Sequence, residues 1–558
     1  MLFLCLCGCM LFFSQVINLA GIEFTTTTTS QVHNENFRIK NAHLNSVKVK
    51  TPPLKHTANN KKQQQQQDDT ENHAIAGLNC DGHGGPSEEI AAEMVYWRDI
   101  PSDSVFKSPY ANYGPEKKYL TFEPDEGGWN NIRIGMETAV ALAYAMGRTL
   151  VLPAEISLYS SNEGQKRNRF TFKKFFYFDA IAEEHTGVEV ITAEEFLKNE
   201  VMNGLFKDEN GNPIFPPGNR TSWDGHIRMS QKYYNWLRIV TGAPKWNFDQ
   251  CFIGLPSTAG GSTSTLENAF KIAKERAGMK KFIDNPTPVD ASVEERIAEM
   301  KGHRRDICIY DPSFQQKPVM HFMGDNNSGA RLLVHFYAFL FFENWQQDLS
   351  TKRFVRDHLR YIDEIQCAAA RVVNAVREES QKNGDKRVYD SFHIRRGDFQ
   401  YKNTRVEADE IYENVRDMFV ENSTVFVATD ERNMTFFEPL RKHYKLYFLH
   451  DFHHLLKGVN KNYYGMLDQL VASRGRLFAG SYYSTFTGYI NRIRGYHSQK
   501  DKLLGYEKGQ LNSIFYIPKN HKHDMRHYHN LKPPLWAREF PVGWRDLNHD
   551  VEDKAIVS

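Results

Sequence analysis

The chain has 558 residues, and its 70 Lys and Arg residues nearly balance its 68 Asp and Glu residues, which leaves a net charge of +2. That balance excludes the extended basic surface on which nucleic-acid binding depends, so no nucleic-acid partner is expected. With 41% hydrophobic and 13% aromatic residues, the chain is neither fibrous nor disordered overall, and it is long enough for more than one domain.

Residues 1–22 contain no charged side chain and are mostly apolar. Their length is close to the roughly 20 residues that cross a bilayer, but Ser14 and Gln15 interrupt the run. A cleaved signal peptide and a retained single-pass (type II) membrane anchor both remain open, and the polar spacer that follows favours the anchor. Either reading predicts that the rest of the chain lies in the lumen of the endoplasmic reticulum or Golgi.

Residues 23–88 include the polar tracts Thr25–Ser30 and Asn59–Asp68 and few large apolar side chains. Such a composition cannot bury enough apolar surface to offset the entropy of ordering the chain. We therefore expect a disordered stem that acts as a spacer.

The interpretation of the cysteines and of the glycosylation sequons depends on the expected lumenal location. The cysteines outside the apolar segment are Cys80, Cys251, Cys308 and Cys367. In an oxidising lumen they could form up to two disulfides, and their wide spacing argues against a zinc site. The Asn-x-Ser/Thr sequons, which predict a glycoprotein, are at Asn219, Asn326, Asn422 and Asn433.

The first globular elements follow one another as strand, helix and strand. The pattern predicts a strand over 118–122, a helix over 132–146 with one apolar face, and a strand over 148–152. Further along, a mixed charged and apolar pattern predicts one long helix over 352–378 that links two halves.

A second set of alternating elements follows that long helix. The expected strands cover 388–394, 424–428, 446–449 and 477–479, and the expected helices cover 408–420, 433–443 and 463–473. Alternation at these lengths predicts a parallel sheet with helices on both faces. We therefore expect an N-terminal domain over 89–350, a C-terminal domain over 351–510, a cleft between them, and a tail over 511–558.

The first candidate site is the loop Glu126–Asn131, which follows the strand over 118–122. Ligands of parallel sheets bind at the carboxyl ends of strands. Gly127 and Gly128 would let the backbone approach a ligand closely, and the next helix would offer free N–H groups to an anion. The alternative is an ordinary tight turn.

The second candidate site is His393–Phe399, where a strand meets its loop. Arg395 and Arg396 could hold a diphosphate through bidentate hydrogen bonds and neutralise the charge on a leaving group. His393 points to the same side of the strand as Arg395, although a core histidine is the plainer interpretation. Residues 396–398 also spell Arg-Gly-Asp, but an adhesion loop should be mobile and exposed rather than follow an apolar strand.

The third candidate site combines Asp468 with Ser484, Thr485 and Phe486. The two hydroxyls could cap a helix or donate to phosphate oxygens, and the ring could stack on a base. Each has a structural alternative, namely a cap, a solvated carboxylate or a core aromatic.

In order, these motifs resemble those of the protein O-fucosyltransferase superfamily, over about 119–495. His393–Phe399 matches the His-Leu-Arg-Arg-x-Asp-Phe pattern of the member that fucosylates thrombospondin repeats. The spacing of sixteen residues between Asp468 and Ser484 also matches that member. The stretches Gly127–Arg133 and Met146–Pro153 are more similar to the plant, fungal and algal branch.

This resemblance implies an α/β fold of two facing Rossmann-like domains (GT-B type) with the donor in the cleft. It implies inverting, metal-independent transfer of fucose from GDP-fucose to a hydroxyl of a protein or glycan, with no cofactor. Arg395 would hold the diphosphate, His393 and Asp468 would contact the nucleotide, and Ser484, Thr485 and Phe486 would bind phosphate and guanine. The absence of an Asp-x-Asp motif agrees with a metal-free mechanism.

The first loop departs from the family pattern. The thrombospondin-repeat enzyme takes its general base from a Gly-Glu-Gly-Phe-Asn run, whereas Glu126 here is one residue out of register. Glu126 is therefore either the base or a surface residue, and Asn130 is the favoured ligand contact in this loop. The alternatives are a transferase with another nucleotide sugar or a cell-wall polysaccharide acceptor, and an inactive glycan- or nucleotide-binding module. We assign no metal role to the histidines of 521–529.

Overall fold

The structure of the protein is a computed structural model that describes residues 75–551 with gaps. The gaps are 99, 115–116, 126, 154–155, 158–168, 219–230, 243, 245, 248–249, 276–285, 302–303, 325–331, 333–336, 398, 400, 403–404, 519–538 and 540. The predictions for the apolar segment 1–22, most of the stem, Asn219, Asn326 and the histidines of 521–529 lie outside these residues. No helix within the described ranges is both long and apolar enough to cross a membrane.

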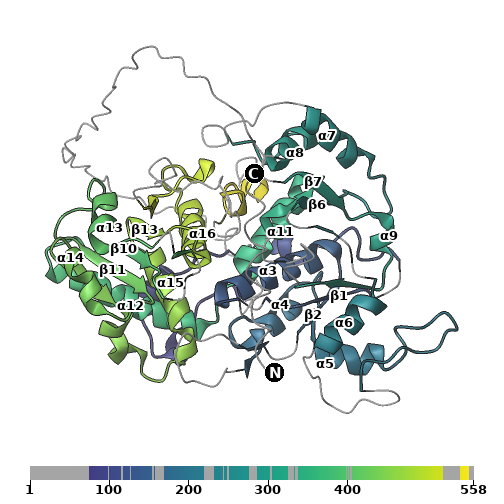
Figure 1. Ribbon diagram of the computed structural model, residues 1–558, viewed down its shortest axis with the longest axis horizontal. Coiled ribbons are helices and arrows are strands. Elements are labelled where there is room, and N and C mark those ends of the chain that lie inside the picture. The colour runs from purple at the N-terminus through teal and green to yellow at the C-terminus, as the bar shows by residue number, and fades with distance from the viewer. Residues whose placement is uncertain are drawn as a thin grey trace, which may run out of the picture. The chain divides into compact units, whose positions relative to one another are not determined.

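The N-terminal half contains two parallel sheets (Figure 1). The first has the order β5-β2-β1-β8, with strands Val190–Thr192, Thr149–Leu152, Tyr119–Phe122 and Val319–Phe322. The second has the order β7-β6-β9, with strands Asp306–Ile309, Cys251–Leu255 and Leu340–Phe342. A short antiparallel pair joins β3 (Ile156–Ser157) to β4 (Arg169–Phe170).

The C-terminal half is built on one parallel sheet of order β12-β11-β10-β13-β14. Its strands are Lys445–Phe448, Thr424–Thr429, Asp390–Ile394, Phe478–Ser481 and Ser513–Tyr516. The order reverses at β10, so the carboxyl ends of β10 and β13 flank a switch point at which ligands of such sheets bind. Both halves confirm the predicted α/β class with parallel strands.

The main helices alternate with these strands. They are α3 (Trp129–Met146), α4 (Phe178–Glu184), α6 (Gln231–Val240), α7 (Ser264–Glu275), α8 (Val293–Lys301), α11 (Trp345–His358), α12 (Asp363–Lys382), α13 (Ala408–Val415), α15 (Tyr464–Ser473) and α16 (Thr485–Lys500). Short helices are α1 (Glu88–Ala92), α2 (Pro101–Ser104), α5 (Ala193–Phe196), α9 (Pro312–Gln315) and α14 (Glu438–Arg441). Helix α3 lies beside α11 and α16 (Figure 1).

The single long helix expected over 352–378 is wrong, because α11 ends at His358 and α12 begins at Asp363. Arg360 lies in the break and is fully buried. Its guanidinium bonds the Asp363 carboxylate at 2.7 Å and the Gly77 carbonyl at 2.9 Å. The bond to Asp363 is local, whereas the bond to Gly77 connects the break to a segment 283 residues earlier in the chain. The helix expected over 433–443 is also shorter, with a 3₁₀ turn over Met434–Phe437 ahead of α14.

The two disulfides that the lumenal hypothesis allows are both present. Cys80 bonds Cys367 on α12, and Cys251 bonds Cys308, which joins β6 to β7. The first ties down residues that the sequence assigned to the stem, and Ile75 nearby is also buried. The end of the expected stem, from residue 75 to 88, is therefore anchored on the domain.

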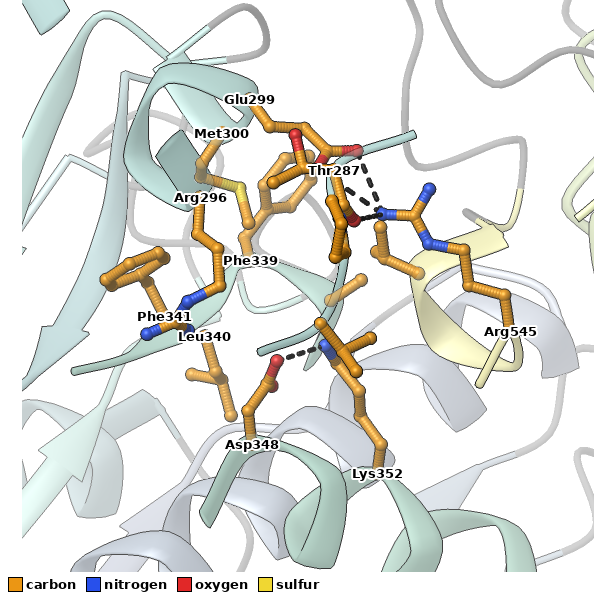
Figure 2. Close-up of a pocket in the computed structure, with 14 residues that line it drawn as sticks. Thr287, Arg296, Glu299, Met300, Phe339, Leu340, Phe341, Asp348, Lys352 and Arg545 are labelled. Carbon is orange, nitrogen blue, oxygen red and sulfur yellow. Dashed lines mark hydrogen bonds and ion pairs between the residues drawn. The ribbon is translucent and has the colours of Figure 1, made fainter. Parts of the chain in front are cut away.

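The expected tail over 511–558 also contains ordered structure. Strand β14 pairs with β13, and the C-terminal strap, defined here as Glu539 and residues 541–551, packs into the core. Trp544 is fully buried against Gly495 of α16, where an added Cβ would lie 2.4 Å from the indole ring. Further along the strap, Arg545 contacts Glu299 of α8 at 3.0 Å, beside a cavity of about 60 Å³ (Figure 2).

Trp544→Ala should lower the free energy of unfolding by about 3–5 kcal/mol, because it leaves a large void under α16. Chemical denaturation followed by circular dichroism measures this loss. Leu504→Ala is the control, because Leu504 is fully exposed and its removal should cost less than about 0.5 kcal/mol. Equal stability of the two variants would show that the strap does not contribute to the core.

Candidate active site

The loop after β1 presents the N-terminus of α3 without a side chain over it. The Gly127 N–H donates to Asp125 Oδ1 at 2.7 Å. A Cβ on Gly127 would come within 2.5 Å of Asn131 Nδ2, so this position needs glycine. Gly128 is the N-cap, and among the described residues no atom lies within 4 Å of where its Cβ would be and no side chain caps the helix. The first main-chain N–H groups of α3 therefore have no capping side chain among the described residues and can donate hydrogen bonds to a ligand.

Two adjacent asparagines connect this loop to the C-terminal half. Asn130 is buried, and its Oδ1 accepts a hydrogen bond from Gln469 Nε2 of α15 at 2.7 Å. Asn131 is partly exposed, and its Oδ1 accepts from Thr485 Oγ1 at 3.0 Å. Thr485 is the first residue of α16, whose N-cap Ser484 makes no side-chain capping bond. Two helix N-termini without side-chain caps thus meet at one place, which favours an anion there.

At the end of β10, His393 is buried and oriented by α16. Its Nδ1 lies 2.6 Å from Thr487 Oγ1, and its ring stacks on Phe486 with centroids 4.4 Å apart. Burial and the neighbouring Arg395 charge lower the pKa of His393 to about 3. The imidazole is therefore neutral at physiological pH.

Arg395 and Arg396 diverge after β10. The Arg395 N–H donates to Ser481 Oγ at 2.8 Å, and its guanidinium pairs with the Asp430 carboxylate while keeping 28% of its side chain exposed. Asp430 also accepts from the N–H groups of Arg396 at 2.8 Å and Gly397 at 3.0 Å. One carboxylate at the end of β11 therefore fixes both the loop and the guanidinium that it carries.

Arg396 turns toward its own domain. Its Nε lies 3.1 Å from Glu431 Oε2, and its guanidinium lies 4.0 Å from the centre of the Phe436 ring. An adhesion motif would need this side chain to project outward, and Asp398 lies outside the described residues. These contacts argue against the Arg-Gly-Asp interpretation.

Asp468 lies on α15 next to Gln469, which reaches the first loop. Its side chain is partly buried, and its Oδ1 has no hydrogen-bond partner among the described residues. Burial raises the pKa of this carboxyl well above its ordinary value. Asp468 therefore has hydrogen-bonding capacity to offer to a ligand.

Glu126, the predicted base, lies outside the described residues, and its described neighbours are engaged. Glu123 is held by Arg238 at 2.6 Å and lies 3.1 Å from His321 Nε2. Burial alone would raise the pKa of Glu123, but these hydrogen bonds outweigh it and lower the pKa to about 2. Asp125 accepts from Gly127. A carboxylate held at such a pKa is a poor proton acceptor, so Glu123 is unsuited as a general base.

The structure brings residues of the three predicted loops together through the hydrogen bond between Thr485 and Asn131 and the ring stack between His393 and Phe486. Sequence reasoning placed Asn131 in the first loop without giving it a role, and it missed Asp430, Ser481, Thr487 and Gln469. A carboxylate at the end of the neighbouring strand was the available signal for Asp430, because the ends of adjacent parallel strands lie side by side. Across the described ranges, no three His, Cys, Asp or Glu side chains cluster in a way that could hold a metal ion.

The parallel sheets define an α/β protein, and two helix N-termini near a partly exposed arginine at the strand ends are chemically suited to a phosphorylated ligand. The family described as GDP-fucose protein O-fucosyltransferase matches residues 119–497, which is more than half of the chain. The chain therefore belongs to this family. No curated protein matches the sequence significantly.

Solved structures that match the chain are distant. POFUT1 in complex with GDP has 14% sequence identity and a TM-score of 0.30, over 72% of this chain and 99% of that chain. POFUT1 in complex with GDP-fucose has 16% identity and a TM-score of 0.27, over 74% and 99%. A mutant of Arabidopsis thaliana FUT1 in complex with GDP has 10% identity and a TM-score of 0.34, over 82% of each chain. The family match, rather than these likenesses, identifies the chain.

Gly127→Ala and Gly128→Ala should separate the fold of the first loop from ligand contact. Gly127→Ala forces its Cβ against Asn131 and should lower the free energy of unfolding by about 1–3 kcal/mol. The Cβ of Gly128→Ala meets no atom of the described residues within 4 Å, so this change should leave stability unchanged while weakening GDP binding by about tenfold or more. Thermal unfolding and calorimetric titration measure the two effects. Unchanged GDP affinity in Gly128→Ala would mean that the ligand does not approach this backbone.

The depressed pKa of His393 should make the fold sensitive to acid. In the unfolded chain His393 binds a proton at about pH 6.5, whereas in the folded chain it stays neutral down to about pH 3. Its contribution to stability is therefore complete above about pH 6.5 and is lost as the pH falls toward 3. Between about pH 7.5 and pH 5, wild type should lose about 2 kcal/mol more than His393→Asn, as measured by urea unfolding. Parallel losses would show that His393 is not held neutral.

Proposed function

We propose that the protein is an inverting, metal-independent glycosyltransferase that moves fucose from GDP-fucose to a hydroxyl of a protein or glycan acceptor. Membership of the GDP-fucose protein O-fucosyltransferase family supports the donor and the reaction class. The meeting of the α3 and α16 N-termini at Asn131 and Thr485 is the observation that carries the rest of the proposal.

The diphosphate would lie at these two N-termini. Main-chain N–H groups of a helix N-terminus bind phosphate oxygens, and the Ser484 and Thr485 hydroxyls can add further donors. Arg395 supplies positive charge from the end of β10, and Asp430 preorients its guanidinium. A fixed guanidinium and two helix N-termini can neutralise a departing diphosphate, which is the task that a metal performs in other transferases.

The nucleoside would lie toward α15 and the His393–Phe486 pair. The contact with Thr487 engages His393 Nδ1, which leaves Nε2 to face the nucleotide. The Phe486 ring offers an aromatic face to guanine, and Asp468 offers a carboxyl whose Oδ1 has no partner in the described part of the chain. Asn130 remains a proposed backbone contact, since its side chain is engaged with Gln469.

The reaction would be a single displacement. The acceptor oxygen attacks C1 of fucose, the bond from C1 to the phosphate oxygen breaks, and GDP leaves with the electron pair. A carboxylate takes the proton of the acceptor hydroxyl, and we assign this role to Glu126. The engagement of Glu123 by Arg238 and His321 supports the choice of Glu126 over Glu123.

We also propose that the enzyme works in the lumen of the secretory pathway on a single-pass anchor. The two disulfides support an oxidising compartment. Asn422 and Asn433 are both exposed, as glycan acceptors must be.

Arg395→Ala should lower the turnover number by about a hundredfold or more and leave the fold intact, because the lost interaction acts mainly on the leaving group. Steady-state assays with GDP-fucose and an accepted substrate measure this change. Arg396→Ala is the matched control from the same loop. It loses an ion pair with Glu431, and its turnover should stay within about threefold of wild type. Unchanged turnover in Arg395→Ala would overturn its role.

Nucleotide binding should be selective for guanine and independent of metal. Calorimetric titration of the full chain in excess EDTA should detect GDP and GDP-fucose, with UDP and ADP binding at least about tenfold more weakly. Binding that requires added magnesium would refute the metal-free mechanism, and equal binding of all nucleotides would refute guanine recognition.

A further inference from the structure

A cluster of four buried charged side chains connects α3, α16 and the C-terminal strap. Its members are Arg133 and Glu137 of α3, Arg492 of α16 and Glu539 of the strap, and each side chain is at most 2% exposed. The Glu137 carboxylate lies 2.5 Å from the Arg133 guanidinium and 2.7 Å from the Arg492 guanidinium. The Glu539 carboxylate lies 3.2 Å from the Arg133 guanidinium and 4.0 Å from the Arg492 guanidinium.

The cluster has no net charge, but its geometry is demanding. Taking charges out of water is costly unless each has a partner of opposite sign at close range. The Arg133 guanidinium also lies 3.6 Å from the centre of the Tyr489 ring of α16, so its position is fixed from a third side. A small displacement of either helix would leave a buried charge without its partner.

These charges lie close to the helix ends that form the proposed donor site. Arg133 is four residues from the start of α3 at Trp129, and Arg492 is seven residues from the start of α16 at Thr485. At about 1.5 Å per residue, they are about 6 Å and 10 Å along the helix axes from the two N-termini. The hydrogen bond between Asn131 and Thr485 closes the same pair of helices at their ends.

We propose that Glu539 is a positioning residue for the donor site: by pairing with arginines of both α3 and α16, it sets the spacing of the two helix N-termini that hold the diphosphate. This inference rests on the proposed function. Glu539 is the one member of the cluster that belongs to neither helix, so it can be changed without altering either of them. This role of Glu539 gives the C-terminal strap a part in donor binding.

The test compares Glu539→Gln with Glu299→Gln in the full-length protein. Glu539→Gln keeps the shape and removes the charge that pairs with Arg133 and Arg492. Glu299→Gln removes the charge that pairs with Arg545 at the other ion pair of the same strap, beside the cavity in Figure 2. Calorimetric titration should show GDP affinity reduced at least about tenfold in Glu539→Gln and unchanged in Glu299→Gln. A lower melting temperature with unchanged GDP affinity in Glu539→Gln would overturn the proposal.

Hydrogen exchange without nucleotide separates this proposal from the identity of the ligand. Amide exchange at 128–132 and 485–488 should accelerate in Glu539→Gln and stay at the wild-type rate in Glu299→Gln. If wild type fails to bind GDP, the proposed function is lost, while the exchange data still decide whether Glu539 positions the helix ends. If Glu539→Gln does not fold, Glu539→Asp keeps the charge on a shorter side chain and should give the same pattern in milder form. Wild-type exchange at both segments would overturn the positioning role.

Discussion

The buried charges between α3 and α16 are the constraint on which the candidate active site depends. The ion pairs among Arg133, Glu137, Arg492 and Glu539 form only if the two helices and the strap hold one relative position. The two arginines lie within two helical turns of the helix N-termini, so the same position fixes the surface that faces the proposed diphosphate. An ion cluster of this kind is weak evidence for stability, but it gives specificity to one arrangement.

The parallel sheets supply the remaining groups at their carboxyl ends. Strand β10 delivers His393 and Arg395, and β11 delivers Asp430, which holds the Arg395 guanidinium and the following backbone. Helix α15 adds Asp468 and, through Gln469, a bond to the first loop. Because the contributing side chains start at strand ends, near helix N-termini or, for Asp468 and Gln469, within α15, the site needs few long loops to form. In the proposed complex, the helix N-termini would bind the diphosphate and the strand ends would orient it.

The sequence predicted those strands, helices and site motifs that local residue patterns determine. Strands β10 and β11 and helix α15 were placed to within about two residues, because their apolar runs have clear lengths and ends. The three site motifs were found for the same reason, since each follows a strand. The contact between Asn131 and Thr485 was missed because the two residues are 354 residues apart, and no local pattern encodes such a contact. The strap was taken for a tail because its anchors act through side chains from distant elements, and the break near Arg360 has the same origin.

A structure of the full-length protein with bound GDP tests the central claim most directly. The account predicts that the diphosphate lies between the N-termini of α3 and α16, with its oxygens within hydrogen-bond distance of main-chain N–H groups at 128–131 and 485–487 and of the Arg395 guanidinium. A diphosphate bound away from both helix ends, or one that contacts only one of them, would contradict it.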